Sequence, residues 1–286
     1  SIGDAIAAAD GETIVLLRGV VESVTIPESA EVTLDLNGFK ITNTEGNHTI
    51  TNKGTLTVKD SEGGGVVDNV THGKGALVNY GTATVKGGTF TRSTSPTDSG
   101  NNSWYVVDNQ RTMTFDGGKV VNNSKFSSLV RNLKGTLTIN AGEFKNDFIA
   151  LKNDEGGTLV VNDGVVTSDE QSLQNWSNAT LSGGTFNGRV ATWGYTGTDV
   201  DGDNTAIGET TITGSAVVNG DVQAINYLKS ETPPVVTVSG GTVNGDISKA
   251  KHEGNGTQEV EPDAETSTIV VTGGSFEKTE SNGEAL

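Results

Sequence analysis

The feature that most constrains this chain is a repeated unit of three short strands separated by tight turns. Its first two copies comprise residues 50–52, 54–58 and a strand from 66, then residues 77–79, 81–85 and a strand around 90. Within 54–58 and 81–85, threonine alternates with leucine, valine or alanine, which is the period-two pattern of a half-buried strand. A Gly-Gly pair precedes each third strand and supplies the positive φ angles of a sharp corner.

The middle strand of the unit returns along the chain at 112–115, 135–139, 158–161, 179–181, 211–213, 236–238 and 269–271. The period varies from roughly 20 to 33 residues, a range typical of solenoids and propellers. A unit this short cannot bury a face alone, so the copies must stack, each strand pairing with its counterpart in the next turn. Three strands per unit favour a coil over four-stranded propeller blades. The sequence therefore predicts an all-β fold, a single-stranded parallel β-helix with three faces and about ten turns.

Asparagine recurs at one position of the unit and supports this register. The first strand of each copy ends in the pattern apolar-x-Asn, which gives the column Asn52, Asn79, Asn109, Asn132, Asn153, Asn175 and, more loosely, Asn226. Stacked turns would place these side chains about 4.8 Å apart, where their amides can donate and accept along the stack. Asparagine is also a common turn residue, which is the alternative explanation. Recurrence in one register favours the ladder.

The composition fits one elongated domain rather than a globule. Only 33% of the residues are hydrophobic and 39 are glycine, which suits a core one or two side chains wide. We expect residues 1–286 to form a single β-helix domain, with residues 11–286 in its coils. The chain has no cysteine, so it can contain neither a disulfide nor a thiol nucleophile.

The net charge of −17 restricts the partners. Nucleic acid is disfavoured because phosphate backbones require a basic surface. Anionic membranes and polyuronates are disfavoured too, unless a cation bridges them. No apolar run reaches transmembrane length, so we expect no membrane insertion. The start at Ser1 without methionine predicts a segment of a longer protein, with any signal peptide or wall anchor outside it.

Residues 1–10 predict the one helix of the chain. Ser1 and Asp4 suit a first helical turn, and Ile2, Ile6 and Ala9 share one face. The open end of a coil of strands would otherwise pair with a neighbouring chain. We therefore expect this short amphipathic helix to cap the core at the N-terminal end.

The segments that follow carry a family resemblance. They are Gly11-Glu12-Thr13-Ile14, Val24-Thr25-Ile26-Pro27, Thr33-Leu34-Asp35-Leu36-Asn37-Gly38 and the recurrent Gly-Thr-Leu-Thr-Val and Gly-Gly-Thr-Phe units. With them the chain resembles the pectate-lyase-like right-handed β-helix superfamily, and in particular the repetitive surface proteins of Gram-positive, often gut-dwelling, bacteria. The resemblance covers nearly the whole chain and implies a right-handed coil. It does not fix the activity, because the superfamily hosts lyases, hydrolases, adhesins and plain stalks.

The catalytic motifs of that superfamily are not found in this sequence. Its polygalacturonase-like members use clustered aspartates with a Gly-His-Gly and an Arg-x-Lys motif, whereas His48, His72 and His252 stand alone here. Its lyase-type members need a Ca²⁺-binding carboxylate cluster beside an arginine base, and only Arg111 and Arg131 fall near one corner column. The separation of paired carboxylates depends on the fold, so an enzyme stays open as the alternative.

Four insertions interrupt the repeat, at residues 91–103, 194–209, 228–234 and 250–267. The last three leave, in consecutive turns, from the corner that follows the asparagine column. Loops that start at one corner of stacked turns should pack side by side. We expect them to form the most differentiated surface of the rod, because binding on a rigid scaffold usually resides in loops.

Aromatic residues follow the asparagine corner in the same turns. Trp176, Trp193 and Tyr227 are predicted to line up on three consecutive rungs, and Tyr195 lies close by. Exposed aromatic side chains in a row offer a flat amphipathic surface to sugar rings or to a protein partner. We predict that these four residues form a ligand-binding site. The alternative is that they pack against one another and seal the corner.

Asp199, Asp201 and Asp203 alternate in the insertion that follows Trp193. Carboxylates at positions one, three and five resemble the start of a Ca²⁺ loop. The stretch departs from an EF-hand, since Gly202 occupies position four and Thr210 position twelve. A weak Ca²⁺ site is one interpretation and a solvated acidic turn is the other. We predict no further cofactor.

Together these features predict a non-catalytic extracellular module of a bacterial surface protein, attached to the cell wall through regions outside this segment. It would act as an adhesin-like or stalk domain that presents loops to a host or microbial glycan or to a surface protein. The alternative is a carbohydrate-active enzyme of the same fold, either a polysaccharide lyase or a glycoside hydrolase.

Overall fold

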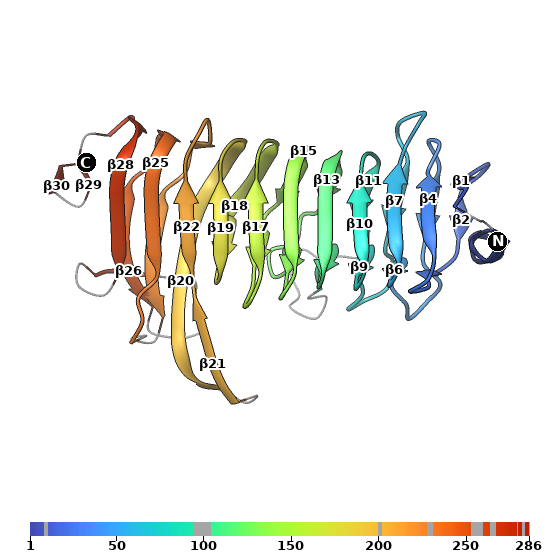
Figure 1. The fold of residues 1–286 in the computed structure, drawn as a ribbon, viewed down its shortest axis with the longest axis horizontal. Coiled ribbons are helices and arrows are strands. Elements are labelled where there is room, and N and C mark those ends of the chain that lie inside the picture. Colours follow the sequence, from blue (N-terminus) through green and yellow to red (C-terminus); the bar gives the residue numbers. More distant parts are fainter. Residues whose placement is uncertain are drawn as a thin grey trace.

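The computed structural model describes residues 1–8, 11–93, 104–199, 202–227, 231–252, 260–263, 267–278, 280–281 and 284–285. The chain coils around one axis from end to end and forms a long rod (Figure 1). Within these described residues one sheet contains 28 strands, and strands of successive turns pair in parallel. The fold is a right-handed parallel β-helix, which confirms the prediction from the repeat.

Three columns of strands form the three faces of the coil. The first face contains β3 (Val24–Ile26), β6 (Ile50–Asn52), β9 (Leu77–Asn79), β12 (Val107–Asn109), β14 (Ser128–Asn132), β16 (Ile149–Asn153), the second half of β18 (Val165–Asn175), the middle of β20 (Thr185–Asp199), β24 (Val222–Tyr227) and β26 (Ile247–His252). The second face contains β1 (Thr13–Val15), β4 (Glu31–Asp35), β7 (Thr55–Lys59), β10 (Thr82–Val85), the first halves of β13 (Thr112–Val121) and β15 (Thr136–Asn146), β17 (Thr158–Val161), β19 (Asn178–Leu181), β22 (Glu209–Ile212), and the first halves of β25 (Val235–Val243) and β28 (Thr268–Phe276).

The third face contains β2 (Val20–Val21), β5 (Lys40–Thr42), β8 (Val66–Asp68), β11 (Thr89–Thr91), β23 (Val217–Val218) and the remaining halves of the long strands. Four short strands lie outside the three columns: β21 (Gly202–Ile207), β27 (Glu261–Pro262), β29 (Glu280–Ser281) and β30 (Glu284–Ala285). Strands β13, β15, β25 and β28 are long because they pass the corner between the second and third faces with only a shift in register. Strands β18 and β20 pass the corner between the third and first faces in the same way.

Successive turns lie in register, so that like residues stack on one another. On the second face, Thr57 pairs with Thr84, and Thr84 pairs with Thr114. The alternate side chains, such as those of Leu56 and Met113, are 1% and 0% exposed. This alternation is what a strand of period two dictates, and it produces a core that is narrow but continuous along the rod.

The asparagine column forms a buried ladder of hydrogen bonds at the end of the first face. Nδ2 of each residue donates to Oδ1 of the next at 2.7–2.8 Å, in the order Asn52, Asn79, Asn109, Asn132, Asn153 and Asn175. Each Nδ2 group also donates to main-chain carbonyls at the corner, as Asn79 does to Thr112 at 2.8 Å. The ladder therefore ties neighbouring turns together through side chains as well as through the sheet.

The prediction that Asn226 belongs to this ladder is wrong. The ladder ends at Asn175, whose Nδ2 donates to Oγ1 of Thr210 at 2.8 Å. Thr192 occupies the next rung, and Ala224 the rung after it. Asn226 lies two residues further along its strand and pairs with Gly194. The predicted register fails here because the strand continues past the corner instead of turning there.

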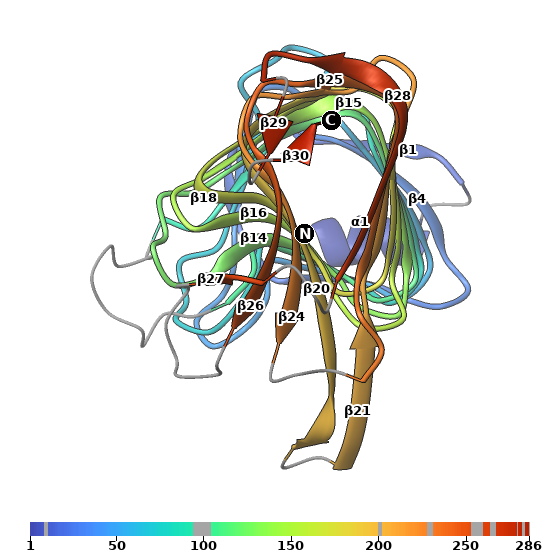
Figure 2. The ribbon, with the colours of Figure 1, turned by 90° about the vertical axis from the view of Figure 1, so that its left-hand side faces the viewer.

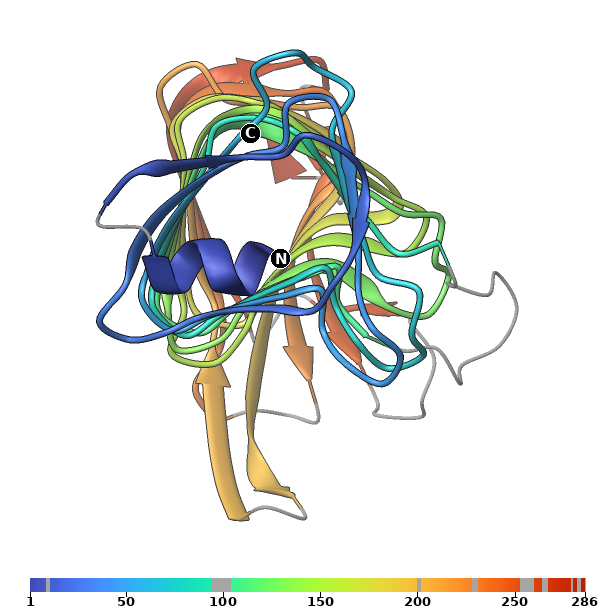
Figure 3. The same ribbon diagram turned by 90° about the vertical axis from the view of Figure 1, so that its right-hand side faces the viewer.

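Helix α1 (Ile2–Ala8) lies across the open N-terminal end of the coil (Figure 3). Ile2 and Ile6 are buried against the core, as the amphipathic pattern predicted. The Glu22 carboxylate accepts the main-chain N–H groups of Ile2 and Gly3, both at 2.8 Å, and so satisfies donors at the start of the helix. The predicted cap is confirmed over residues 2–8, and residues 9–10 lie outside the described part.

Strands of the first face extend beyond the coil at its C-terminal half and form what we call the flange, comprising residues 193–199, 202–207, 225–227, 250–252 and 261–262. In it β20, β24 and β26 continue in parallel, β21 adds antiparallel to β20, and β27 adds antiparallel to β26. Figures 1 and 2 show β20 and β21 projecting away from the rod as an arm.

The expectation that residues 194–209 form a loop is wrong, because most of them form this hairpin arm. Once β20 passes the corner without turning, its outer edge needs hydrogen-bond partners, and β21 supplies them from Gly202 to Ile207. Residues 250–252 and 261–262 are likewise strand rather than loop. Of the other predicted insertions, residues 94–103 and 228–230 lie outside the described part.

Candidate functional site

The four aromatic residues singled out from the sequence meet at the base of the flange. Trp176 stacks on Trp193 with ring centroids 5.2 Å apart, and Tyr227 contacts both rings edge-on at 5.9 and 6.1 Å. Tyr195 contacts Tyr227 at 5.4 Å. His252 also joins the group, stacked on Tyr227 at 4.9 Å. We call these five residues the aromatic cluster.

The alignment within the aromatic cluster differs from the predicted one. Trp193 pairs with Ile225, and Tyr227 pairs with Tyr195. Trp176 and Trp193 each directly follow a paired rung of consecutive turns, as predicted. Tyr227, in the next turn, lies two residues further out along the flange than predicted. The cause is the continuation of β24 past the corner that also displaced Asn226. Tyr227 nevertheless contacts Trp176, with the two ring centroids 5.9 Å apart.

Exposure divides the aromatic cluster into a base and a rim. Trp193 is 2% exposed, its Nε1 donates to Oε1 of Gln171, and it belongs to a small second core with Ala191 and Ile225. Trp176, Tyr195 and Tyr227 are half-buried. Trp193 therefore supports the base of the flange, and ligand binding stays a prediction that concerns the edges of the other three rings.

The aspartates predicted to bind Ca²⁺ fall at the tip of the arm. The main chains of Asp199 and Asp203 belong to β20 and β21. Asp201 and the side chains of all three aspartates lie outside the described part of the structure, so Ca²⁺ binding stays a prediction. Elsewhere in the described ranges, no group of three or more His, Cys, Asp or Glu side chains is arranged to hold a metal ion.

A second candidate site, a groove of about 360 Å³ on the outside of the first face, was not recognised from the sequence. Its wall consists of Trp104, Tyr105, Phe126 and Phe148, from the corners that lead into β12, β14 and β16, and its remaining lining is Ser127, Ser128, Arg131, Ile149, Lys152 and Gln174. We call it the lateral groove. The main-chain carbonyl of Trp104 accepts hydrogen bonds from Arg92 and Ser127, which anchor this wall.

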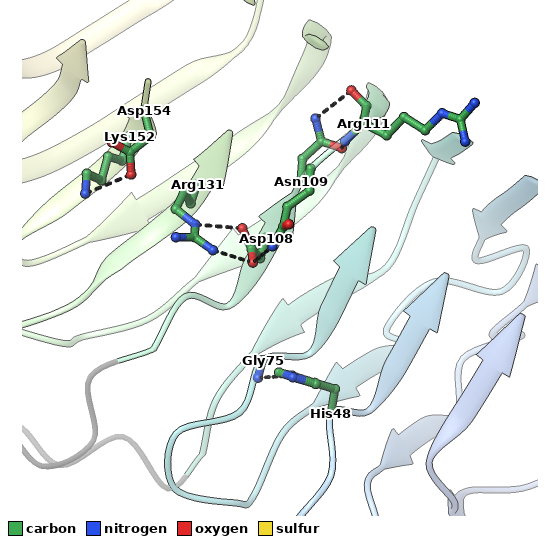
Figure 4. A network of polar contacts seen from close by, with 9 residues as sticks. His48, Gly75, Asp108, Asn109, Arg111, Arg131, Lys152 and Asp154 are labelled. Carbon is green, nitrogen blue, oxygen red and sulfur yellow. Dashed lines mark hydrogen bonds and ion pairs between the residues drawn. The ribbon is translucent and has the colours of Figure 1, made fainter. Parts of the chain in front are cut away.

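Arg131, which lines the lateral groove, forms an ion pair with Asp108 (Figure 4). Arg131 donates through Nε and Nη2 to both carboxylate oxygens of Asp108 at 2.8 Å, and Asp108 is fully buried. The ring of Tyr105 covers the guanidinium at 4.4 Å. Burial alone would lower the pKa of Arg131, but the contacts with Asp108 outweigh it and raise this pKa above its usual value.

The next residues of the same column continue the groove floor with polar groups. Lys152 pairs with Asp154 at 3.0 Å. Gln174, 6% exposed, and Ser128, 7% exposed, line the groove, and their side chains make no hydrogen bond to another described residue. The lateral groove thus presents aromatic surface, an amide, a hydroxyl and two cations that already have counter-ions.

A sequence signal for this floor exists in the repeat itself. Asp108, Arg131, Lys152 and Gln174 each precede an asparagine of the ladder and pair in that order along the face. The side chain at the middle position of apolar-x-Asn points away from the core. The change at this position from Val78 to Asp108 in the next turn therefore indicates a polar outer surface on this face. The aromatic wall carries no such signal, because its members come from corners of unequal length.

His48 lies beside the lateral groove and provides a pH-dependent test of the structure. Its Nδ1 accepts the Gly75 N–H at 2.9 Å (Figure 4). Its ring contacts that of Trp104, with centroids 5.7 Å apart. Burial, with a contribution from Lys74, lowers the pKa of His48, although Asp108 acts in the opposite direction. Protonation therefore opposes the folded arrangement.

We expect the free energy of unfolding to fall as the pH drops below about 6.5, because the unfolded chain then binds more protons at His48 than the folded chain. The loss should continue until the lowered folded pKa is reached. His48→Gln keeps an acceptor for Gly75 and should reduce this pH dependence. Denaturation curves between about pH 7.5 and about pH 5.5 measure the effect. An NMR titration midpoint of His48 at or above about 6.5 would contradict it.

Comparison with known proteins adds no family to this description. No protein-family model, no curated protein and no solved structure matches the chain.

Proposed function

We propose that this chain is a non-catalytic binding module of an extracellular bacterial surface protein, an adhesin-like β-helix that holds a glycan or a protein ligand at its flange. One observation carries the proposal: the regular coil is interrupted at consecutive turns to build a projecting sheet with half-buried aromatic rings at its base. Rigid scaffolds position binding elements in this way, and aromatic rims suit sugar rings and protein partners alike.

The state of the carboxylates on the first face supports binding rather than catalysis. Asp108 is held by both guanidinium donors of Arg131, and the Asp154 carboxylate contacts Lys152. Hydrolases place two carboxyl groups on opposite sides of a scissile bond, and lyases cluster them around a cation. In the lateral groove these carboxylates face cations of the protein itself. A polysaccharide lyase or glycoside hydrolase is the second candidate, on the resemblance to the pectate-lyase-like superfamily.

The resemblance to repetitive Gram-positive surface proteins motivates the extracellular part of the proposal, with attachment to the cell wall through regions outside residues 1–286. In the described part of the chain, helix α1 has only seven residues. No helix there is long and apolar enough to cross a bilayer. The net charge of −17 makes nucleic acid an unfavourable partner.

The test is a glycan array and a panel of host-surface proteins probed with the purified chain. For a ligand held at the flange, Tyr227→Ala is expected to lower the affinity about tenfold, since it removes a rim ring. Tyr80→Ala is the matched control, because Tyr80 is an exposed tyrosine on a distant turn of the same corner.

The outcomes separate the candidate functions. Binding that Tyr227→Ala weakens and Tyr80→Ala does not, with no products released from the bound glycan, supports the proposal. Release of reducing ends or unsaturated products would establish the enzyme instead. Absence of any ligand across the array and the panel would leave the rod as a plain stalk and contradict the binding role.

A further inference from the structure

We infer that the lateral groove is a second binding site, separate from the aromatic cluster, and that its ligand is an uncharged pyranose residue of a glycan chain. This inference goes beyond the proposed function, because it concerns other residues and names the class of ligand. It rests on three properties of the groove: its aromatic wall, its unpartnered polar groups and its balanced charge.

The aromatic wall adds ring edges to a groove whose accessible lining is mostly polar. Trp104 and Tyr105 lie with ring centroids 5.7 Å apart and tilted by 56°, and Phe126 is 43% exposed. One face of Tyr105 is occupied by Arg131, so the ring is fixed in place by its neighbours. Pockets that bind small molecules are lined in this way, by aromatic surface with a few placed polar groups. The C–H faces of a pyranose can pack on such rings.

The polar groups of the floor lack partners that a folded protein normally provides. The Gln174 amide offers two donors and an acceptor, and the Ser128 hydroxyl offers a donor and an acceptor. Both residues are more than nine-tenths buried and line the groove, and their side chains make no hydrogen bond to another described side chain or main-chain group. Nη1 of Arg131 is a further donor, since the ion pair with Asp108 uses Nε and Nη2. The polar atoms of Gln174 and Ser128 are not sealed from solvent, so they face the groove and can exchange water for a ligand rich in hydroxyls.

Charge decides between an uncharged and an acidic sugar. Arg131 and Lys152 would attract a carboxylate if they were free, but Asp108 and Asp154 neutralise them. The net charge of these four residues is zero, and the whole chain carries −17. A carboxylate, sulfate or phosphate would have to compete with Asp108 for the same guanidinium inside a strongly acidic protein. A hydroxyl needs only the remaining Nη1 donor.

The volume is consistent with this class of ligand. At about 360 Å³ the groove lies at the lower end of small-molecule sites, roughly 300–1,000 Å³, which suits part of an oligosaccharide rather than a folded partner.

The experiment is isothermal titration of the purified chain with neutral tetrasaccharides of glucose, mannose, galactose and N-acetylglucosamine, beside tetragalacturonate as the acidic probe. We expect at least one neutral tetrasaccharide to bind, with an affinity that changes little with salt. Phe126→Ala and Gln174→Ala should each weaken this binding about tenfold or more. Tyr80→Ala and Gln223→Ala are the controls, because Tyr80 is as exposed as Phe126 and Gln223 lies in the column of Gln174 but beyond the groove.

Each result decides the matter. Neutral-sugar binding that is lost in Phe126→Ala and Gln174→Ala but kept in the two control variants supports the site. Because Phe126 is exposed, its substitution should not unfold the protein, so misfolding would not explain the loss. Stronger binding of tetragalacturonate, or no binding of any neutral tetrasaccharide at millimolar concentration, overturns it. Binding that is lost only in Tyr227→Ala would leave the proposed function intact and would remove the lateral groove from it.

Discussion

Gly81→Ala is expected to destabilise the protein by about 3–5 kcal/mol, one of the largest effects of any single methyl group in this chain. A Cβ atom at this position would lie 2.1 Å from the main-chain oxygen of Gly54 and 2.7 Å from the carbonyl carbon of Lys53. Both contacts are backbone of the preceding turn, so no side chain can rotate away. The turns would have to separate at the corner, where Thr112 N–H donates to the Gly81 carbonyl.

The matched control for this prediction is Gly87→Ala in the same turn. Its Cβ would approach no atom closer than 3.2 Å, the N of Asp60, so we expect a loss of about 1 kcal/mol or less. Urea denaturation followed by circular dichroism measures both variants. Equal losses would contradict the role of the close approach between the two turns, because the restricted unfolded chain of an alanine variant would by itself stabilise both proteins.

The corners explain why the sequence predicts so much of this fold. Gly54 and Gly81 recur because the backbone of one turn touches the backbone of the next. Asn79 and Asn109 recur because the side chain of each donates a hydrogen bond to the asparagine at the same position of the next turn. These constraints act at one fixed place in every turn, so they appear as columns in the sequence, and the register of the turns can be assigned from those columns alone.

The sequence pattern fails where strands run straight past a corner into the flange instead of turning with the coil. The end of β20 leaves the corner as a straight strand, and Thr192 replaces asparagine on that rung. Residues beyond it are no longer held by the repeat, so counting from the corner misplaced Asn226 and Tyr227 by two positions. Pairing between strands decides the register there, and pairing between segments that are not repeats is not visible in one sequence.

The lateral groove, too, could be predicted from the sequence only where its residues belong to the repeat. Arg131 and Gln174 belong to a regular column and could be aligned from the sequence. Trp104 and Phe126 reach the groove from corners whose lengths differ from turn to turn, so their meeting depends on the path of each corner. By contrast, Trp176 and Trp193 were predicted to be neighbours because both directly follow a rung of the asparagine column.

Asn109→Ala is expected to lower the free energy of unfolding by about 3–5 kcal/mol, because it breaks the ladder at its centre. Asn109 is fully buried; its Oδ1 accepts from Asn79 at 2.8 Å, and its Nδ2 donates to Asn132 at 2.7 Å and to the Thr136 carbonyl at 3.1 Å. Alanine leaves the Asn79 donor and the Asn132 acceptor without this partner inside the protein, at about 1–3 kcal/mol each. Urea denaturation gives the total, and hydrogen exchange should show the loss of protection centred on these turns.

Asn140→Ala is the control that separates the effect of burial from that of the hydrogen bonds themselves. The chain also contains an exposed series of side-chain hydrogen bonds between turns, and Asn140 belongs to it. Asn140 donates to Asp116 and accepts from Asn162, both at 2.8 Å, but on the solvent side of a corner. Water replaces those partners after the substitution, so we expect a loss of about 1 kcal/mol or less. If both variants lost the same stability, the ladder would act only as a set of turn residues. A difference of several-fold would instead show that the stacked amides hold the turns together because water cannot reach them.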